Sequence, residues 1–240
     1  NTSAYGFLTD DFKWYNIAAA KTIESETSYA ESNKLISFYG RINYGYADRY
    51  LFTATVRHDG SSRFGANHKW GTFPSFAASW RITEEPFFHA KAVSNLKLRT
   101  SWGITGNQEI GNYNSISTLS AYSWGYIFGG EKKTVVLPQQ YANPDLKWES
   151  TSQTDIGLDF GFFDNRLRGT IDWYYKKTHD LLLSVAVPSP SLITTQLANV
   201  GSVRNTGLEI ELGFDIIQKK AFIWVVNVNF STNSHKLPSL

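Results

Sequence analysis

Asp155, Asp159 and Asp172 are the residues whose type and spacing come nearest to a catalytic arrangement. Two neighbouring carboxylates can cleave a glycosidic bond, one as proton donor and the other as base or nucleophile. These aspartates, however, alternate along the chain with Arg168 and Lys176. That alternation favours a ladder of ion pairs, so we expect no catalytic residue here.

Other chemical motifs are missing from the sequence. The five histidines show no His-Glu-x-x-His spacing, the chain contains no cysteine, and no Gly-x-Ser-x-Gly segment occurs. A zinc site, a disulfide framework and a hydrolase elbow are therefore not expected. The formal net charge of +2 is too small to indicate nucleic-acid binding. We expect neither an enzyme nor a cofactor.

Two groups of residues could bind a ligand. An aromatic run in the long segment 106–147 could stack on sugar rings or contact a partner protein, or it could simply pack the loop: Tyr113, Tyr122, Trp124, Tyr126 and Phe128. Four arginines could attract an anionic substrate, although pairing with acids on neighbouring strands is the simpler expectation: Arg41, Arg57, Arg81 and Arg99.

The elements that carry these residues are strands of unusual length. Segments 152–162 and 167–177, joined by a turn at 163–166, alternate between apolar and polar residues from Ile156 to Tyr175, with Gly169 in the apolar register. Successive side chains of a strand point to opposite faces, so the pattern predicts one apolar and one charged face. Strands of about 10 residues match the length that a tilted strand needs to cross a bilayer. We therefore expect the apolar face to contact lipid.

The same alternation predicts eight antiparallel strands, at 37–46, 50–57, 75–82, 96–104, 152–162, 167–177, 208–216 and 222–231. The apolar register, which ends at Tyr175 in segment 167–177, contains no Asp, Glu, Lys or Arg. This fits a lipid-facing surface, where an Arg or Lys costs about 2–4 kcal/mol near the midplane. The opposite register carries the charges, and we predict that these residues line a lumen: Arg41, Arg57, Arg81, Arg99, Asp155, Asp159, Arg168, Asp172, Glu209 and Glu211.

Composition permits a second fold. Aromatic residues make up 15% of the chain, and Tyr and Trp suit membrane interfaces. The same content fits a soluble, aromatic-rich β-sandwich that binds carbohydrate, which is our first alternative. No apolar run reaches the 18 residues of a spanning helix.

The connections predict an orientation. Short turns at 47–49, 163–166 and 217–221 fall on one side with the longer segment 83–95, and long loops at 60–72, 106–147 and 179–205 fall on the other. Outer-membrane barrels place long loops outside the cell. Both chain ends would then be extracellular, which favours an internal portion of a large barrel over our second alternative, a small closed eight-stranded barrel. Residues 1–34 are expected to form a loop with at most a short helix near 16–21.

Five segments resemble motifs of the SusC/RagA family of TonB-dependent outer-membrane transporters of Bacteroidetes-type bacteria. They read RHDGSSRFG at 57–65, KWGTFPS at 69–75, WGITGN at 102–107, NPDLKWE at 143–149 and NVGSVRNTGLE at 199–209. Pro144 holds the residue before it extended, and Trp148 suits an interface. We expect the five motifs to be architectural and not substrate-binding.

The resemblance implies a 22-stranded barrel with a plug domain in its lumen, energised through TonB and covered by a SusD-like surface lipoprotein. Such proteins import oligosaccharides or peptides across the outer membrane. Residues 1–240 would then be one partial β-barrel domain, from which the plug and the terminal strands are absent. A portion of this size is not expected to transport by itself.

Overall fold

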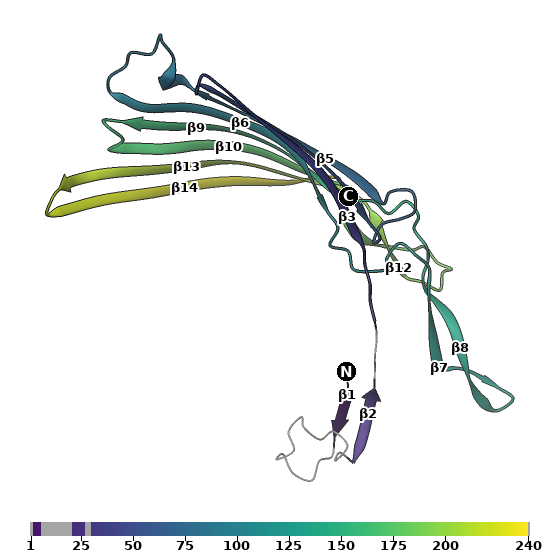
Figure 1. Ribbon diagram of the computed structural model, residues 1–240. Helices are drawn as coiled ribbons and strands as arrows, with labels where there is room; N and C mark the ends of the chain where they lie inside the picture. Colours follow the sequence, from purple (N-terminus) through teal and green to yellow (C-terminus); the bar gives the residue numbers. More distant parts are fainter. Residues whose placement is uncertain (1, 6–20, 27–29, 240) are drawn as a thin grey trace. The chain divides into compact units, whose positions relative to one another are not determined.

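Eight long strands pair in a single antiparallel sheet (Figure 1). The computed structural model describes residues 2–5, 21–26 and 30–239, without the side chains of 2–5, 22–26, 122–126 and 132. The chain divides into two units, 1–33 and 34–240, each described by itself. Within the described ranges, no helix is long and apolar enough to cross a membrane.

The predicted all-β, eight-stranded architecture is confirmed. The sheet order is β14-β13-β10-β9-β6-β5-β4-β3, an antiparallel meander in chain order. Its strands are β3 (Leu35–Tyr46), β4 (Tyr50–Ser61), β5 (Trp70–Arg81), β6 (Val93–Asn107), β9 (Glu149–Phe162), β10 (Leu167–His179), β13 (Ser202–Lys219) and β14 (Phe222–Ser239). All eight extend beyond the strands expected from alternation at one end or both, because pairing continues where alternation ends.

Three segments expected to be loops contain strands. Residues 106–147 include β7 (Thr118–Phe128) and β8 (Glu131–Gln140), which pair with each other. Residues 179–205 include β11 (Leu182–Ala186) and β12 (Thr195–Asn199), another pair. The first unit contains paired β1 (Thr2–Tyr5) and β2 (Thr22–Glu26). Residues 16–20, the main part of the expected helix, lie outside the described residues. The loop expectation was wrong for these strands because none of their sequences shows a sustained alternation of apolar and polar residues.

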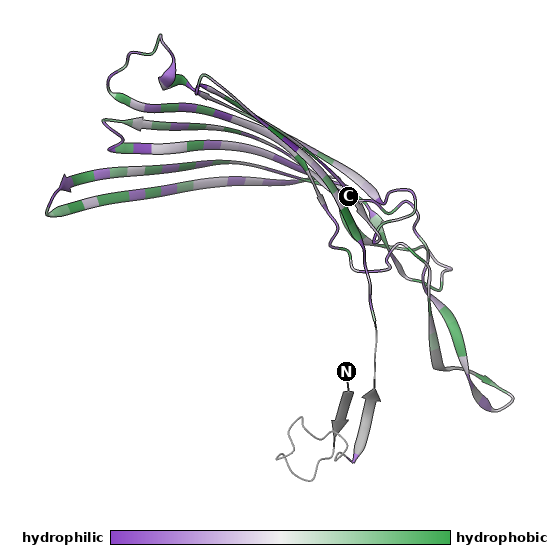
Figure 2. Ribbon diagram, viewed as in Figure 1, coloured by the Kyte–Doolittle hydropathy of each residue, from purple (hydrophilic) through white to green (hydrophobic). Residues whose placement is uncertain are grey.

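The register keeps the two faces separate across the whole sheet. One row of hydrogen-bonded neighbours runs Tyr44, Phe52, Ala78, Thr100, Ile156, Trp173, Leu208 and Thr232. The adjacent row, on the other face, runs Gly45, Leu51, Ser79, Arg99, Gly157, Asp172, Glu209 and Ser231. Figure 2 shows the resulting alternation of hydrophobic and hydrophilic residues along the strands. We call the first face outward and the second inward.

The outward face is apolar yet open to its surroundings. Phe52 is 49% exposed and Ile156 is 46% exposed, and many large apolar side chains of this face are similarly uncovered. A soluble protein rarely leaves so large an apolar surface without a partner. These side chains can therefore be shielded from water only by an apolar surrounding medium, such as the hydrocarbon of a membrane.

Stacked aromatic rings bound this surface at both ends. Tyr50 stacks on Tyr46 and on Trp80 with ring centroids 6.4 Å apart in each pair, and Phe38 stacks on Trp70 at 6.3 Å. From Phe38 to Tyr46, β3 rises about 26 Å at about 3.3 Å per residue. Because strands of outer-membrane barrels tilt by about 35–45°, this length corresponds to a height of about 20 Å, which is most of the apolar band of about 25 Å between their aromatic girdles.

The two ends of the sheet differ in their connections, as the sequence predicted. One end carries the turns 47–49, 163–166 and 220–221 and the connection 82–92. The other end carries the connections 62–69, 108–148 and 180–201. Ala47 and Asp48 take positive φ values of 52° and 55°, the mirror-image turn geometry that matches strand twist.

Glu85 fastens the connection 82–92 to the short-turn end. Its Oε1 accepts hydrogen bonds from Tyr50 Oη (2.5 Å) and Trp80 Nε1 (2.8 Å), and Arg49 Nη1 lies 3.6 Å from Oε2. The hydrogen bonds from Tyr50 and Trp80, followed by the charge of Arg49, lower the pKa of Glu85 despite its burial. The carboxylate is therefore stabilised in its ionised form.

We predict that Glu85→Gln destabilises the full-length protein at pH 7 but not at strongly acidic pH. A lowered pKa in the folded state stabilises the fold above the unfolded-state pKa of about 4.3, and this contribution disappears as pH falls through the lowered value. Thermal unfolding in detergent should therefore show a gap between wild type and variant at pH 7 that shrinks below pH ~4. A gap that stays constant with pH would contradict this assignment.

Candidate functional site

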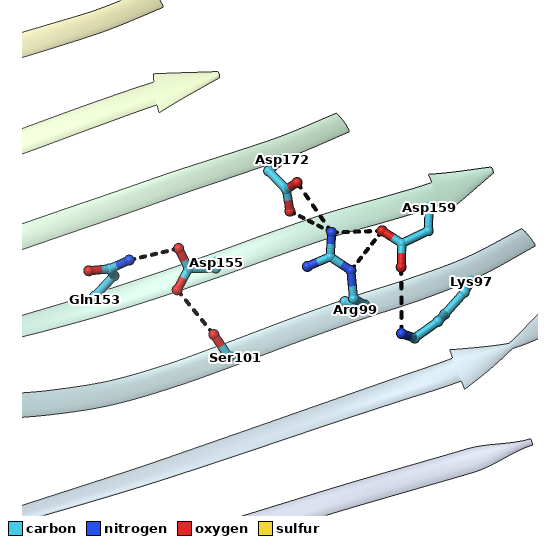
Figure 3. A network of polar contacts seen from close by, with 7 residues as sticks. All are labelled: Lys97, Arg99, Ser101, Gln153, Asp155, Asp159 and Asp172. Atoms are coloured by element: carbon cyan, nitrogen blue, oxygen red, sulfur yellow. Dashed lines mark hydrogen bonds and ion pairs between the residues drawn. The ribbon is translucent and has the colours of Figure 1, made fainter. Parts of the chain in front are cut away.

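A connected ion network occupies the middle of the inward face (Figure 3). Arg99 on β6 reaches across β9: its Nη2 lies 2.7 Å from Asp159 Oδ1 and 3.0 Å from Asp172 Oδ1. Lys97 Nζ lies 3.5 Å from the other oxygen of Asp159. The carboxylates of Asp159 and Asp172 are thus both bound by one guanidinium, which fits an ion-pair ladder better than a catalytic pair. Their partners are Arg99 and Lys97, and not the expected Arg168 and Lys176.

Gly157 makes this bridge possible. It lies between Arg99 and Asp172 in the same row, and a Cβ there would meet Asp172 Oδ1 at 2.2 Å and Arg99 Nη2 at 2.8 Å. A larger residue would therefore displace the guanidinium from the strand surface. Gly207 does the same for Tyr174, whose ring would lie about 2.5 Å from an added Cβ.

An open polar hollow of about 710 Å³ adjoins the network. Asp155 Oδ2 accepts a hydrogen bond from Ser101 Oγ (3.0 Å), and Asp155 Oδ1 accepts one from Gln153 Nε2 (2.9 Å). The lining is composed of Arg99, Ser101, Gln153, Asp155, Asp172, Tyr174, Lys176, Asn205, Glu209 and Asn233. Such a surface offers donors and acceptors for polar groups, but within the described residues no cluster of three His, Asp or Glu is placed to hold a metal ion.

The other inward charges fall into two groups. Arg57 pairs with Asp59 at 2.7 Å, and Arg168 pairs with Asp215 at 2.9 Å. Four more of the charges predicted for this face form no ion pair among the described residues: Arg41, Arg81, Glu209 and Glu211. Of the four arginines, Arg99 alone pairs with acids on neighbouring strands among the described residues, because the partner of Arg57, Asp59, lies on the same strand, β4.

Sequence reasoning did not select Lys97 or Gly157 as site residues. Lys97 stands opposite Asp159 in the paired register, and Gly157 stands between the two partners that bridge over it. The alternation in the sequence indicated only that both positions lie on the inward face. Selecting them as site residues would also have required the pairing register between the strands.

A small hydrophobic core lies at the long-loop end. It consists of the buried residues Phe64, Phe73, Leu146 and Trp148, which we call the loop core. The Trp148 ring centroid lies 4.6 Å from that of Phe64 and 5.3 Å from that of Phe73. These residues come from three of the five motifs recognised in the sequence, so the motifs supply packing between loops.

Backbone hydrogen bonds join the same loops. Gly65 N donates to Leu146 O at 2.9 Å, and Asn67 N donates to Pro144 O at 3.1 Å. A Cβ at Gly65 would lie 2.1 Å from Pro144 O, which only glycine avoids. Trp148 Nε1 donates to Lys69 O at 3.2 Å, so the largest side chain of the core is also hydrogen-bonded.

A second clamp ties the segment 180–201 to the same region. Asn199 Oδ1 accepts from Lys147 N at 2.9 Å, and Asn199 Nδ2 donates to Lys147 O at 2.8 Å. Asn199 Nδ2 also donates to Asp180 O at 3.0 Å, and Lys147 Nζ lies 3.0 Å from Asp180 Oδ2. Three long connections are therefore held together at one end of the sheet.

The aromatic run lies in the β7–β8 segment. The side chains of Tyr122, Trp124 and Tyr126 lie outside the described residues, although their backbone belongs to β7. Tyr113 precedes the hairpin, has φ of 66°, and its carbonyl accepts a hydrogen bond from Gln140 Nε2 at 3.2 Å. At the hairpin tip, Ile127 and Phe128 are 72% and 79% exposed. The tip therefore presents apolar surface.

Comparison with known protein families gives one match over nearly the whole chain. The family described as "TonB dependent receptor-like, beta-barrel" matches residues 1–236. The chain belongs to this family. Its members are outer-membrane proteins, so the open apolar face is the lipid-facing surface of outer-membrane strands. The soluble β-sandwich is thereby excluded.

Several relatives in this family are similar to the chain. The TonB-dependent receptor SusC of Bacteroides thetaiotaomicron is 41% identical over 223 residues, which are 91% of this chain and 22% of SusC. The TonB-dependent receptor P3 of Formosa agariphila is 37% identical over 239 residues, 99% of this chain and 24% of that protein. The chain thus spans about a quarter of the length of these relatives.

Solved structures show the same fold. The RagAB peptide importer in its open-open state is 33% identical, with a TM-score of 0.82 over 93% of this chain and 24% of the matched chain. The closed-closed state is 35% identical, with a TM-score of 0.78 over 86% of this chain and 22% of the matched chain. Together these matches place the chain among relatives of SusC and of the RagAB importer.

Proposed function

We propose that the chain forms part of the wall of a SusC-type nutrient importer, which takes up oligosaccharides or peptides across the outer membrane without catalysing a reaction. The observation that carries the proposal is the sorting of side chains by the eight-strand register. Apolar residues face lipid, and ion-paired, hydrogen-bonding residues face the other way. The similarity to the TonB-dependent receptor SusC supports the importer assignment, and the similarity to the RagAB peptide importer supports peptides as one substrate class.

We further propose that residues 1–240 belong to one larger barrel whose plug and remaining strands lie elsewhere in the protein. The two outermost strands, β3 and β14, each pair on one side only, and they do not pair with each other in the described residues. An unpaired strand edge in lipid leaves backbone groups unsatisfied, which costs several kcal/mol per group. Additional strands would satisfy both edges, and the inward charges would then line the lumen. A small closed eight-stranded barrel would instead pair β3 with β14.

The long-loop end is proposed to face outside the cell, where a SusD-like lipoprotein would bind it. The exposed tip of the β7–β8 hairpin supports this placement, since Ile127 and Phe128 would be covered by a partner. Tyr113, Tyr122, Trp124 and Tyr126 are proposed to contact this lid or the substrate. TonB would act through the plug.

Growth of the source bacterium tests the function. We expect deletion of the full-length gene to abolish growth on one class of oligosaccharide or on peptides as the sole carbon source, and complementation to restore it. The same growth should require TonB. Undiminished growth of the deletion strain on a panel of both substrate classes would reject the importer assignment.

Purification of the tagged full-length protein tests the partner. We expect a surface lipoprotein to co-purify with the wild type and to be lost when residues 118–140 are replaced by a short Gly-Ser linker. A variant with the tip residues Ile127 and Phe128 changed to Ser keeps the hairpin and tests its apolar surface alone. Retention of the lipoprotein by both variants would exclude the hairpin as its contact.

A further inference from the structure

Three cations stand side by side at the long-loop end of the sheet. Lys177 on β10 is the register partner of Arg204 on β13, and Arg204 is the partner of Lys236 on β14. Directly opposed residues of antiparallel strands share a face, with Cα atoms about 4.5–5.5 Å apart. Lys177, Arg204 and Lys236 therefore form one continuous row, which we call the cationic row.

The cationic row belongs to the outward face. Along β10, Lys177 follows Trp173 and Tyr175 at alternate positions, and Trp173 pairs with Leu208 of the outward apolar row. On β14, Lys236 has the same parity as the apolar Phe230. The row thus lies beyond the apolar residues of this face. It directly follows Tyr175 on β10, and it is separated from Leu208 by Thr206 on β13 and from Phe230 by Thr232 and Ser234 on β14. Lys176, which precedes Lys177 in the sequence, lies on the inward face.

The row is left without counter-charge by the described residues. In the part of the chain that the structure describes, no ion pair involves Lys177, Arg204 or Lys236. Two carboxylates at the same end of the sheet are engaged elsewhere: Asp180 with Lys147 at 3.0 Å, and Glu149 with the Asn107 side chain and Leu182 N. Like charges directly opposed on a sheet destabilise it, so an external anion would relieve the repulsion.

We propose that the cationic row binds the phosphate-bearing headgroup of an anionic lipid in the leaflet that surrounds the long-loop end. Headgroups lie at the level of interfacial Trp and Tyr residues, and the row follows Trp173 and Tyr175 on the same face. Lys and Arg are the side chains that bind phosphate. A soluble anionic substrate is the poorer occupant, because it would travel along the opposite face.

Native mass spectrometry of the full-length protein in detergent micelles tests the proposal, with dioleoyl phosphatidic acid as the probe and dioleoyl phosphatidylcholine as its uncharged-headgroup comparison. We expect the wild type to bind phosphatidic acid preferentially. The double variant Lys177→Gln/Arg204→Gln should bind it roughly 25-fold more weakly, since each basic residue near a membrane surface contributes about fivefold.

The matched control is Arg41→Gln/Lys176→Gln, which removes the same charge from the inward face and should leave the affinity unaltered. The exchange Lys177→Arg/Arg204→Lys keeps the charge and should retain binding, provided that heat-modifiable migration on gels shows each variant to be folded. Equal loss in the inward control, or wild-type affinity in the outward double variant, would overturn the proposal. Displacement of the lipid by inorganic phosphate would also overturn it, by identifying a soluble anion as the occupant.

Discussion

Replacing Ile210 by Arg is expected to destabilise the folded full-length protein by about 2–4 kcal/mol. Ile210 lies on β13 between Ile171 and Phe230, in an outward row that contacts lipid. A guanidinium there would enter hydrocarbon near the middle of the strand. The free energy of unfolding from lipid vesicles by guanidinium chloride measures the loss, and the yield of heat-modifiable protein in outer-membrane fractions should fall with it.

The neighbouring position provides the control for this prediction. Glu211→Arg introduces the same side chain one residue along β13, on the inward face, where Glu211 is exposed and pairs with Thr170 and Asn229. We expect it to fold with a yield close to wild type. If the two variants proved equally stable, the assignment of the faces to lipid and water would be wrong.

Truncation of the loop core should have a comparable or larger effect. Phe64 is 1% exposed and packs against Trp148, and removal of a fully buried Phe side chain typically costs about 3–5 kcal/mol. We expect Phe64→Ala to loosen the segments 62–69 and 141–148 together, because Gly65 and Asn67 hydrogen-bond to Leu146 and Pro144. Limited trypsin digestion of the full-length protein should then cleave at Lys69 or Lys147 much faster than in the wild type.

Phe128→Ala is the matched substitution for this experiment. It removes the same side chain from a site that is 79% exposed, so cleavage in the loops should be unchanged. If trypsin cleaved Phe64→Ala as slowly as the wild type, the loops would be held by their hydrogen bonds alone. The barrel strands themselves should resist trypsin in every variant.

The division of the sheet into two faces could be predicted from alternation because the period of a strand is local. Ile156, Asp155 and their neighbours already carry the pattern that the register later confirms. Exact partners could not be predicted, because they depend on register between strands. Arg99 and Asp172 are 73 positions apart, and nothing local indicates that they meet over Gly157.

The limits of the strands were the weaker part of the sequence interpretation. Alternation of apolar residues ends where a strand leaves hydrocarbon, but hydrogen bonding continues into water. β13 and β14 therefore run to residues 202 and 239. Two residues of the cationic row, Arg204 and Lys236, lie in these added stretches. The row could not be predicted from strands that end at 208 and 231.

Glycines beneath Arg99 and Tyr174 also determine how thick the polar lining of the wall is. Because Gly157 and Gly207 have no side chain, the guanidinium and the phenol lie flat along the strands instead of standing upright. At these two positions the polar lining of the wall is consequently thin. The proposed passage would be wider there than upright side chains would leave it.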